Sequence, residues 1–205
     1  MPSRNVVREF APDNYYHIYN RGVAKQPIFI DAADKQKFLD ILERHLDPNN
    51  ASQRYDGVRY RKFDKNMELL CYCLMGNHFH MLVYLKSEGQ NISEFMRSVC
   101  TAYTMYFNKR HNRVGTLFQG VFKASRVSND MYLQHITRYI HLNPRTYKTY
   151  NYSSLQYYIG KPDPIWLNTR RILGVFDGDD YLAFIEDYEA QMHMTDDLKY
   201  ELADL

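Results

Sequence analysis

Two histidines, His78 and His80, stand one residue apart at the head of an apolar run that ends at Leu85. Because side chains alternate along a β-strand, both imidazoles would share one face while Phe79 and Met81 face a core. Neutral imidazole binds divalent transition metals, and a two-histidine site completed by oxygen donors leaves coordination positions open for a substrate. The spacing is therefore interpreted as a metal site facing a phosphodiester, although a His-x-His pattern in a strand is more often incidental than metal-binding.

A second pair of polar residues, Tyr139 and Asn143, lies further along the chain. The pattern predicts a helix from a cap at Ser128 or Asn129 to Asn143, so the two side chains lie one turn apart and side by side. An amide oxygen is a hard ligand suited to Mg²⁺ or Mn²⁺. Taken alone, the tyrosine would be packing and the asparagine a helix end. The pair becomes a site candidate only together with the two histidines.

The elements that must position these residues alternate along the chain. Predicted strands cover 15–22, 67–75, 78–85 and 116–127, and predicted helices run from a cap at Asp31 to before Pro48, from 91 to 109 and up to 143. Gly76-Asn77 is a two-residue hairpin signal, and 48–66 has the composition of a long loop or weakly ordered insertion. We expect an α+β fold of the ferredoxin-like sandwich type, with an antiparallel sheet, helices packed on one face and a helical C-terminal extension.

Charge is unevenly distributed, although the net charge of the 205 residues is only +2. From Lys161 onward there are 11 acidic and 4 basic residues, so positive charge is concentrated in 1–160. A basic body suggests a polyanionic partner, although uneven surface charge is also common in proteins that bind no nucleic acid. Three cysteines form neither a disulfide framework nor a zinc signature, and no run is long enough for a membrane span, so we expect a cytoplasmic protein.

Basic residues near the ends of the predicted strands and helices are candidates for phosphate contact. The loop 108–113 is favoured over a solvated charge run because it leads directly into a predicted strand with further cations. The 19 tyrosines, many beside Arg or Lys, suit either base stacking or ordinary packing. The candidate DNA-binding residues are Arg21, Arg110, Arg113, Lys123, Arg126 and Arg138.

The order and spacing of these motifs resemble those of the HUH single-tyrosine transposases, most closely the REP-associated tyrosine transposases. The resemblance covers most of the chain, through segments 16–22, 75–80, 106–111, 113–115, 117–120, 122–123, 138–144, 152–154, 166–167 and 172–176. Gly76 stands where many relatives have proline, which a turn should tolerate. Val121 occupies a position that is often basic in the family, so one phosphate contact would be missing.

The resemblance implies a role for each site residue. His78, His80 and Asn143 would hold Mg²⁺ or Mn²⁺, and Tyr139 would be the nucleophile that cuts single-stranded DNA and forms a 5′-phosphotyrosine. The substrate would be a hairpin of repetitive palindromic DNA, and the protein a monomer or homodimer. Residues 1–160 would form the catalytic domain, and 161–205 an acidic extension packed on or beside it.

Two other functions remain open from the sequence. A metal-dependent nuclease would use water instead of Tyr139 and leave no covalent adduct. A domesticated, sequence-specific DNA-binding protein would bind without strand transfer, although the intact histidines, tyrosine and asparagine argue against a decayed site.

Overall fold

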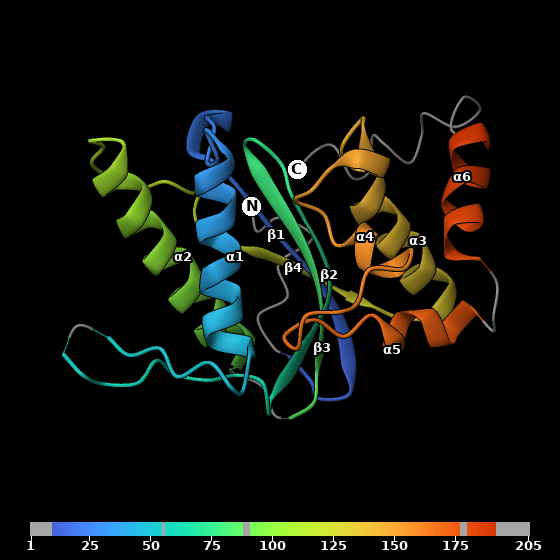
Figure 1. The fold of residues 1–205 in the computed structure, drawn as a ribbon, viewed down its shortest axis with the longest axis horizontal. Helices are drawn as coiled ribbons and strands as arrows, with labels where there is room; N and C mark the ends of the chain where they lie inside the picture. Colours follow the sequence, from blue (N-terminus) through green and yellow to red (C-terminus); the bar gives the residue numbers. More distant parts are fainter. Residues whose placement is uncertain (1–9, 55, 88–90, 177–179, 192–205) are drawn as a thin grey trace, which may run out of the picture.

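The computed structural model describes residues 10–54, 56–87, 91–176 and 180–191 (Figure 1). The strands are β1 (Asn14–Arg21), β2 (Met67–Leu74), β3 (His78–Leu85) and β4 (Lys123–Val127). The helices are α1 (Ala32–Leu46), α2 (Asn91–Arg110), α3 (Asp130–Leu142), α4 (Leu155–Tyr158), α5 (Arg170–Leu173) and α6 (Tyr181–Gln191). Short 3₁₀ turns lie at Val23–Lys25, Tyr147–Thr149 and Gly174–Phe176.

The four strands form one sheet in the order β2-β3-β1-β4, and every neighbouring pair is antiparallel. This order, with α1 after β1 and α2 after β3, is that of the ferredoxin-like sandwich and confirms the predicted α+β class. In the register of β1 and β3, Tyr19 lies opposite His80 and Arg21 opposite His78. The predicted Gly76-Asn77 turn joins β2 to β3, and the Met75 amide donates to the His78 carbonyl at 2.8 Å.

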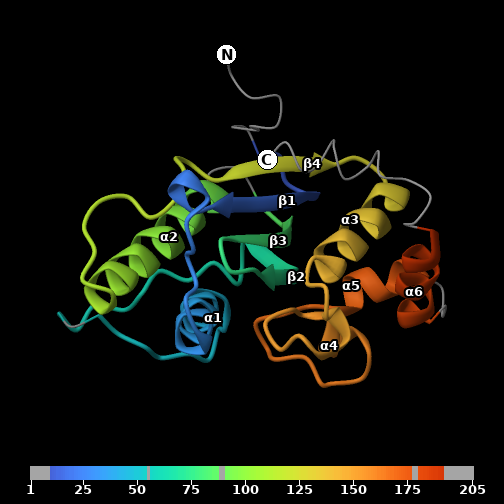
Figure 2. The ribbon, with the colours of Figure 1, turned by 90° about the horizontal axis from the view of Figure 1, so that it is seen from above.

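Helices cover both faces of this sheet rather than the single face expected for the sandwich (Figures 1 and 2). Phe79, Met81 and Val83 of β3 point into a core shared with α1 and α2. The alternate residue Leu82 points into a second core, which α3 and the C-terminal helices close. The period of two therefore holds along β3, and its second face carries both the candidate histidines and the contacts to α3.

Some predicted boundaries differ from the observed elements. The fourth strand begins at Lys123 instead of position 116, because 116–122 forms a loop that is joined to the turn after β1 by a bridge between Phe118 and Gly22. Segment 48–66 contains no helix or sheet strand among its described residues, as predicted. Asp31 caps α1 by accepting from the Asp34 amide at 3.1 Å, also as predicted.

The turn that follows β1 is closely packed around Gly22. A Cβ atom at this position would overlap the Gln26 carbonyl oxygen and lie 2.9 Å from Cγ2 of Ile28. By contrast, a Cβ on Gly76 would meet no atom within 4 Å. A side chain would therefore clash at Gly22, whereas the turn at Gly76 has room for one.

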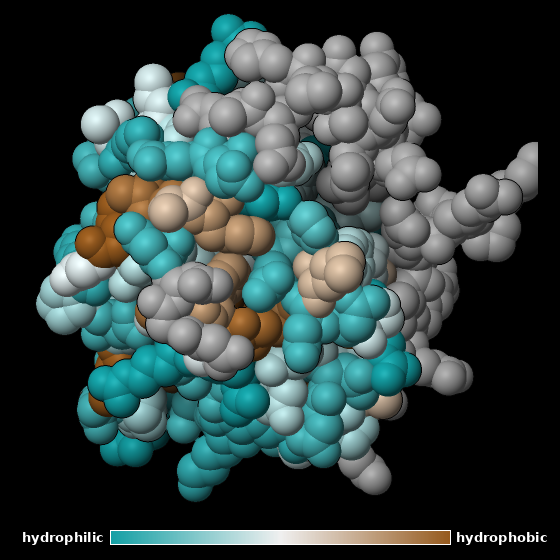
Figure 3. Space-filling view, turned by 90° about the vertical axis from the view of Figure 1, so that its right-hand side faces the viewer, coloured by the Kyte–Doolittle hydropathy of each residue, from teal (hydrophilic) through white to brown (hydrophobic). Residues whose placement is uncertain are grey.

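The C-terminal segment runs alongside β2, one of the two edge strands of the sheet. Leu167 forms a parallel bridge with Leu69, and the Leu74 amide donates to the Tyr152 carbonyl at 2.9 Å. Beyond it, Tyr181 and Ile185 of α6 are buried in the second core. On the side where α6 lies, exposed hydrophobic residues form patches separated by hydrophilic ones (Figure 3). Among the described helices, none has the length and apolar character needed to span a membrane.

Candidate active site

Strand β3 and helix α3 bring the two predicted pairs of polar residues together. His78 Nε2 lies 3.0 Å from Asn143 Oδ1, although the residues are far apart in the sequence. On the other side of the ring, His78 Nδ1 lies 2.7 Å from Asn77 Oδ1. The turn residue and the helix end thus fix the ring of His78 from both sides.

His80 is almost completely buried, and a third imidazole holds it. His17 Nε2 lies 2.9 Å from His80 Nδ1, and the two rings stack with centroids 5.1 Å apart. The centroids of the His80 and His78 rings are also 5.1 Å apart, but these rings are nearly perpendicular. A hydrogen bond at one ring nitrogen fixes the tautomer and orientation of a histidine whose other nitrogen binds a metal. His17 is therefore a positioning residue of the candidate site.

All three imidazoles are held in their neutral form. Burial lowers the pKa of His17 to about 3. Burial also lowers the pKa of His80 well below its usual range, and the neighbouring His17 and His78 add to this effect. The pKa of His78 is lowered by burial too, while its hydrogen bond with Asn143 acts in the opposite direction. Neutral imidazole is the form that coordinates cations.

Tyr139 lies beside these rings. Its ring meets that of His80 edge to face, with centroids 5.3 Å apart, and that of His17 at 6.2 Å. Burial raises the pKa of the Tyr139 phenol, while a hydrogen bond with Asn143 opposes the shift. The phenol is thus more firmly protonated than a free tyrosine, so its activation requires a further positive charge or a base.

Helix α3 is fixed at both ends, which sets the position of Tyr139 and Asn143. Asn129 caps it by accepting from the Tyr132 amide at 2.8 Å. Near the other end, the buried His141 contacts the Tyr181 hydroxyl at 2.6 Å and the Ser154 hydroxyl at 2.8 Å. The apolar stripe predicted to dock this helix is buried in the second core: Leu133, Ile136 and Ile140.

Two of the predicted cations lie close to this constellation. Arg21 and Lys123 line a small pocket together with Tyr19, and the Lys123 ammonium lies 5.9 Å from the centre of the Tyr19 ring. Arg21 Nε donates to Gln119 Oε1 at 2.6 Å. Since Arg21 pairs with His78 and Lys123 with Tyr19 in the sheet register, both cations border the histidines.

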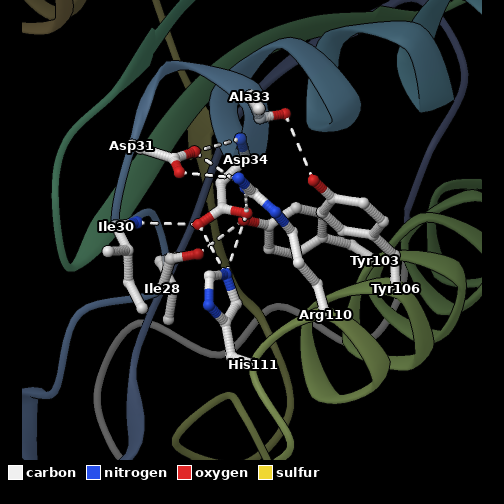
Figure 4. A network of polar contacts seen from close by, with 9 residues as sticks. All are labelled: Ile28, Ile30, Asp31, Ala33, Asp34, Tyr103, Tyr106, Arg110 and His111. Atoms are coloured by element: carbon white, nitrogen blue, oxygen red, sulfur yellow. Dashed lines mark hydrogen bonds and ion pairs between the residues drawn. The ribbon is translucent and has the colours of Figure 1, made fainter.

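Arg110, by contrast, belongs to a network of hydrogen bonds and ion pairs that joins α2 to the start of α1 (Figure 4). Its guanidinium pairs with Asp31 at 2.7 Å and with the completely buried Asp34 at 2.5 Å. Asp34 also accepts from the Ile30 amide at 2.9 Å and contacts His111 Nε2 at 3.0 Å. The structure thus gives Arg110 a role in holding two helices together.

The other three predicted cations lie away from the histidines. The buried Arg138 packs over the rings of Phe184 and Tyr188 in α6. Arg113, in the loop after α2, donates to the side chain of Asn108 in that helix at 3.3 Å. Arg126 is exposed and alternates with Lys123 and Ser125 along β4, so it belongs to the opposite sheet face.

Sequence reasoning missed His17 and Tyr19. Both belong to β1 and alternate with residues of the first core, so they point to the same face as the histidines of β3. A signal was present, because His17, Tyr19 and Arg21 recur at a spacing of two. Their partner strand and its register, however, are set by tertiary pairing.

Comparison with known proteins finds one matching family and two similar solved structures. Residues 43–143 match the family described as IS200-like transposases. The solved structure of a REP-associated tyrosine transposase bound to a REP hairpin aligns with a TM-score of 0.53 and 13% identity, over 78% of this chain and 88% of that one. A protein from Deinococcus radiodurans R1, proposed to be a transposase, aligns with a TM-score of 0.40 and 17% identity, over 68% and 95% of the two chains. No curated protein matches the chain.

The antiparallel sheet with its helices and the matched family define the protein as a transposase, and thus as a DNA-processing enzyme. More specifically, residues 43–143 match the IS200-like transposases, and the fold is shared with a REP-associated tyrosine transposase.

Proposed function

We propose that this protein cuts single-stranded DNA and transfers the strand through a covalent bond to Tyr139. The observation that carries the proposal is the arrangement of four side chains. The Tyr139 ring lies against His80 with centroids 5.3 Å apart, and Asn143, one turn later, contacts His78 at 3.0 Å. A potential nucleophile thus borders a cluster of neutral ligands.

The donor set fits a divalent cation. Two ligand atoms bound at right angles to an octahedral Mg²⁺ lie about 3 Å apart, as His78 Nε2 and Asn143 Oδ1 do. No three His, Cys, Asp or Glu side chains group as a metal site within the described ranges. The proposed third ligand is the amide oxygen of Asn143, which lies 3.0 Å from His78 Nε2. A bound Mg²⁺ or Mn²⁺ would orient the scissile phosphate and stabilise the charge that develops on it.

In the proposed reaction Tyr139 is the nucleophile, and His17 orients His80. The Tyr139 oxygen attacks phosphorus, the bond from phosphorus to the 3′ oxygen breaks, and the phenolic proton ends on the released 3′-hydroxyl. The products are a 5′-phosphotyrosine and a free 3′ end, and attack by a 3′-hydroxyl on the phosphotyrosine reverses the step and joins strands. His17 keeps His80 in the correct orientation, because its ring nitrogen lies 2.9 Å from His80 Nδ1.

Arg21 and Lys123 are the cations that we propose to bind the DNA backbone, because they border the histidines. The proposed substrate is hairpin-forming DNA of the repetitive palindromic type; support comes from the REP hairpin in the similar solved structure. We further propose that 1–160 form the catalytic domain, that 161–205 form an extension beside it, and that the active form is a monomer or homodimer in the cytoplasm.

The experiment that tests this function is a gel assay for a covalent protein–DNA adduct on labelled single-stranded hairpins with Mg²⁺ or Mn²⁺. The wild type should form an adduct that requires the metal and disappears with EDTA. Tyr139→Phe should form none, while Tyr132→Phe, which changes another half-buried tyrosine of α3, should retain it.

Two outcomes would contradict the proposal. Cutting by Tyr139→Phe without an adduct would indicate a nuclease that uses water. Hairpin binding by the wild type without any cutting would indicate a DNA-binding protein with no strand transfer.

A further inference from the structure

A second recognition surface lies outside the candidate active site, in a groove between α1 and the segment 151–166. Its cavity of about 340 Å³ falls within the range of small-ligand pockets, roughly 300 to 1,000 Å³. Tyr72 of β2 is one of its lining residues, and α1 and α4 flank that strand (Figure 1). The remaining residues that matter here are Gln36 and Glu43 on α1, and Gln156, Tyr157, Lys161 and Trp166 on the opposite wall.

The groove has aromatic walls with a cation beside them. Trp166, which is half-buried, stacks on Tyr72 with centroids 5.8 Å apart and planes inclined by 28°. The Lys161 ammonium lies 5.1 Å from the centre of the Tyr157 ring. Aromatic faces bind unpaired bases of any sequence by stacking, whereas the bases of a duplex are already stacked on each other.

The polar groups of the groove suit the edge of a base better than a phosphate. The Gln36 amide donates to Asp40 at 2.9 Å and the Gln156 amide accepts from Lys161 at 3.3 Å. Each side-chain amide has two donor hydrogens and two acceptor lone pairs, so both keep capacity to pair with a base edge. Glu43 would repel a phosphate, but its carboxylate can accept from an exocyclic amino group. Burial raises the pKa of Glu43, and the neighbouring Asp47 and Asp40 add to this shift.

Residues next to the groove lining connect it with the end of β2. Lys35 precedes the lining residue Gln36, and its ammonium lies 4.9 Å from the centre of the Tyr152 ring and 5.4 Å from that of Tyr150. The Tyr150 hydroxyl donates to the Leu74 carbonyl at 2.5 Å, and Leu74 is the last residue of β2. Only the short turn 75–77 separates Leu74 from His78. Because Tyr72 packs in the first core and the histidines lie on the opposite face of the sheet, a DNA strand held at the histidines would reach the groove by passing around the β2 edge.

We propose that this groove binds unpaired nucleobases of the DNA strand that flanks the cut site. The inference rests on the proposed function and extends it, because it assigns a site for the single-stranded part of the substrate. Lys35 and Lys161 would contact the backbone at the two ends, and Trp166 and Tyr157 would contact bases.

Trp166 is the single tryptophan of the chain and therefore reports directly on the groove. The test uses the full-length Tyr139→Phe protein, so that cutting does not interfere. It is titrated with a hairpin that carries a single-stranded flank and, separately, with the same hairpin made blunt. Binding is followed by the anisotropy of labelled DNA, and groove occupancy by the fluorescence of Trp166. The flanked hairpin should quench the emission and the blunt one should not.

Variants of the groove test the same inference without relying on fluorescence. Tyr157→Ala should weaken binding of the flanked hairpin about five- to a hundredfold, which corresponds to the loss of one stacked base, while leaving the blunt hairpin unaffected. Lys161→Ala should weaken it less, and its matched control is Arg97→Ala, which removes an exposed cation from α2.

Several outcomes would overturn the inference. These are flanked DNA that binds without quenching, equal quenching by the blunt hairpin, or unchanged binding by Tyr157→Ala. Emission that depends on protein concentration and not on DNA would assign the groove to a second copy of the chain. Failure of the proposed function is seen separately, as the absence of a covalent adduct with the wild type.

Discussion

Asp34→Asn tests the interpretation of the network in Figure 4 as a clamp between α1 and α2. The Asp34 carboxylate is completely buried and serves three partners: the Ile30 amide, Arg110 and His111. An amide in its place loses the charge and turns an NH₂ group toward hydrogen-bond donors. Removing one partner of a pair in which both members are buried costs about 3 to 5 kcal/mol. Because one-third of the Arg110 side chain is exposed, we expect the lower end of this range, about 3 kcal/mol.

The assay is urea unfolding followed by circular dichroism. With a slope of roughly 2 to 3 kcal/mol per molar urea, the loss of about 3 kcal/mol lowers the midpoint by about 1 to 1.5 M. Asp31→Asn is the control, because it removes a half-exposed charge of the same cluster and retains an oxygen for the helix cap. It should lower the midpoint less. Equal midpoints for the two variants, or no shift with Asp34→Asn, would refute the reasoning.

The lowered pKa of Asp34 also predicts how the stability of the protein depends on pH. Burial favours the protonated form of Asp34, but the hydrogen bonds from Ile30, His111 and Arg110 outweigh it and lower the pKa. A lowered native pKa means stabilisation that is fully present above the unfolded value, near 4, and is lost as the pH falls through the native value. The stability difference between wild type and Asp34→Asn should therefore shrink as the pH falls below about 4.

Two further substitutions test the framework around the site. Gly22→Ala should destabilise the protein by about 1 to 3 kcal/mol, because its Cβ would overlap the Gln26 carbonyl oxygen; Gly76→Ala should leave the urea midpoint unchanged. His141→Ala should cost about 2 to 4 kcal/mol and reduce the covalent adduct, since it leaves a cavity beside α3 and removes a hydrogen-bond partner from the buried hydroxyls of Tyr181 and Ser154, while Tyr181→Phe should cost about 1 kcal/mol. Unchanged thermal unfolding of Gly22→Ala or His141→Ala would contradict these assignments.

Local patterns were enough to predict much of the fold. The alternation around His78 and His80, the Gly76-Asn77 turn and the Asp31 cap are set by neighbouring residues, and all three appear in the structure. The predicted strand from Thr116 was too long, because its first half pairs by a single bridge with the turn at Gly22. Strand propensity alone does not show whether such a segment joins the sheet or pairs with a neighbouring turn.

The candidate site was harder to complete because its supporting contacts are tertiary. The contact of His17 with His80 depends on the register of two strands that are distant in sequence. Arg110 and Arg138 have the composition of phosphate-binding residues, yet one pairs with the start of α1 and the other lies under the aromatic rings of α6. Charge along a sequence indicates a partner but does not identify it.

The path of the C-terminal segment along β2 has a consequence for how the chain can be shortened. An uncovered outer strand offers its free amides and carbonyls to any other strand, which is a common origin of aggregation. Here the Asn168 amide donates to the Leu69 carbonyl at 2.9 Å, and Leu167 continues the pairing. A polypeptide that stopped at residue 160 would lose this cover, so we expect it to aggregate more readily than the full chain.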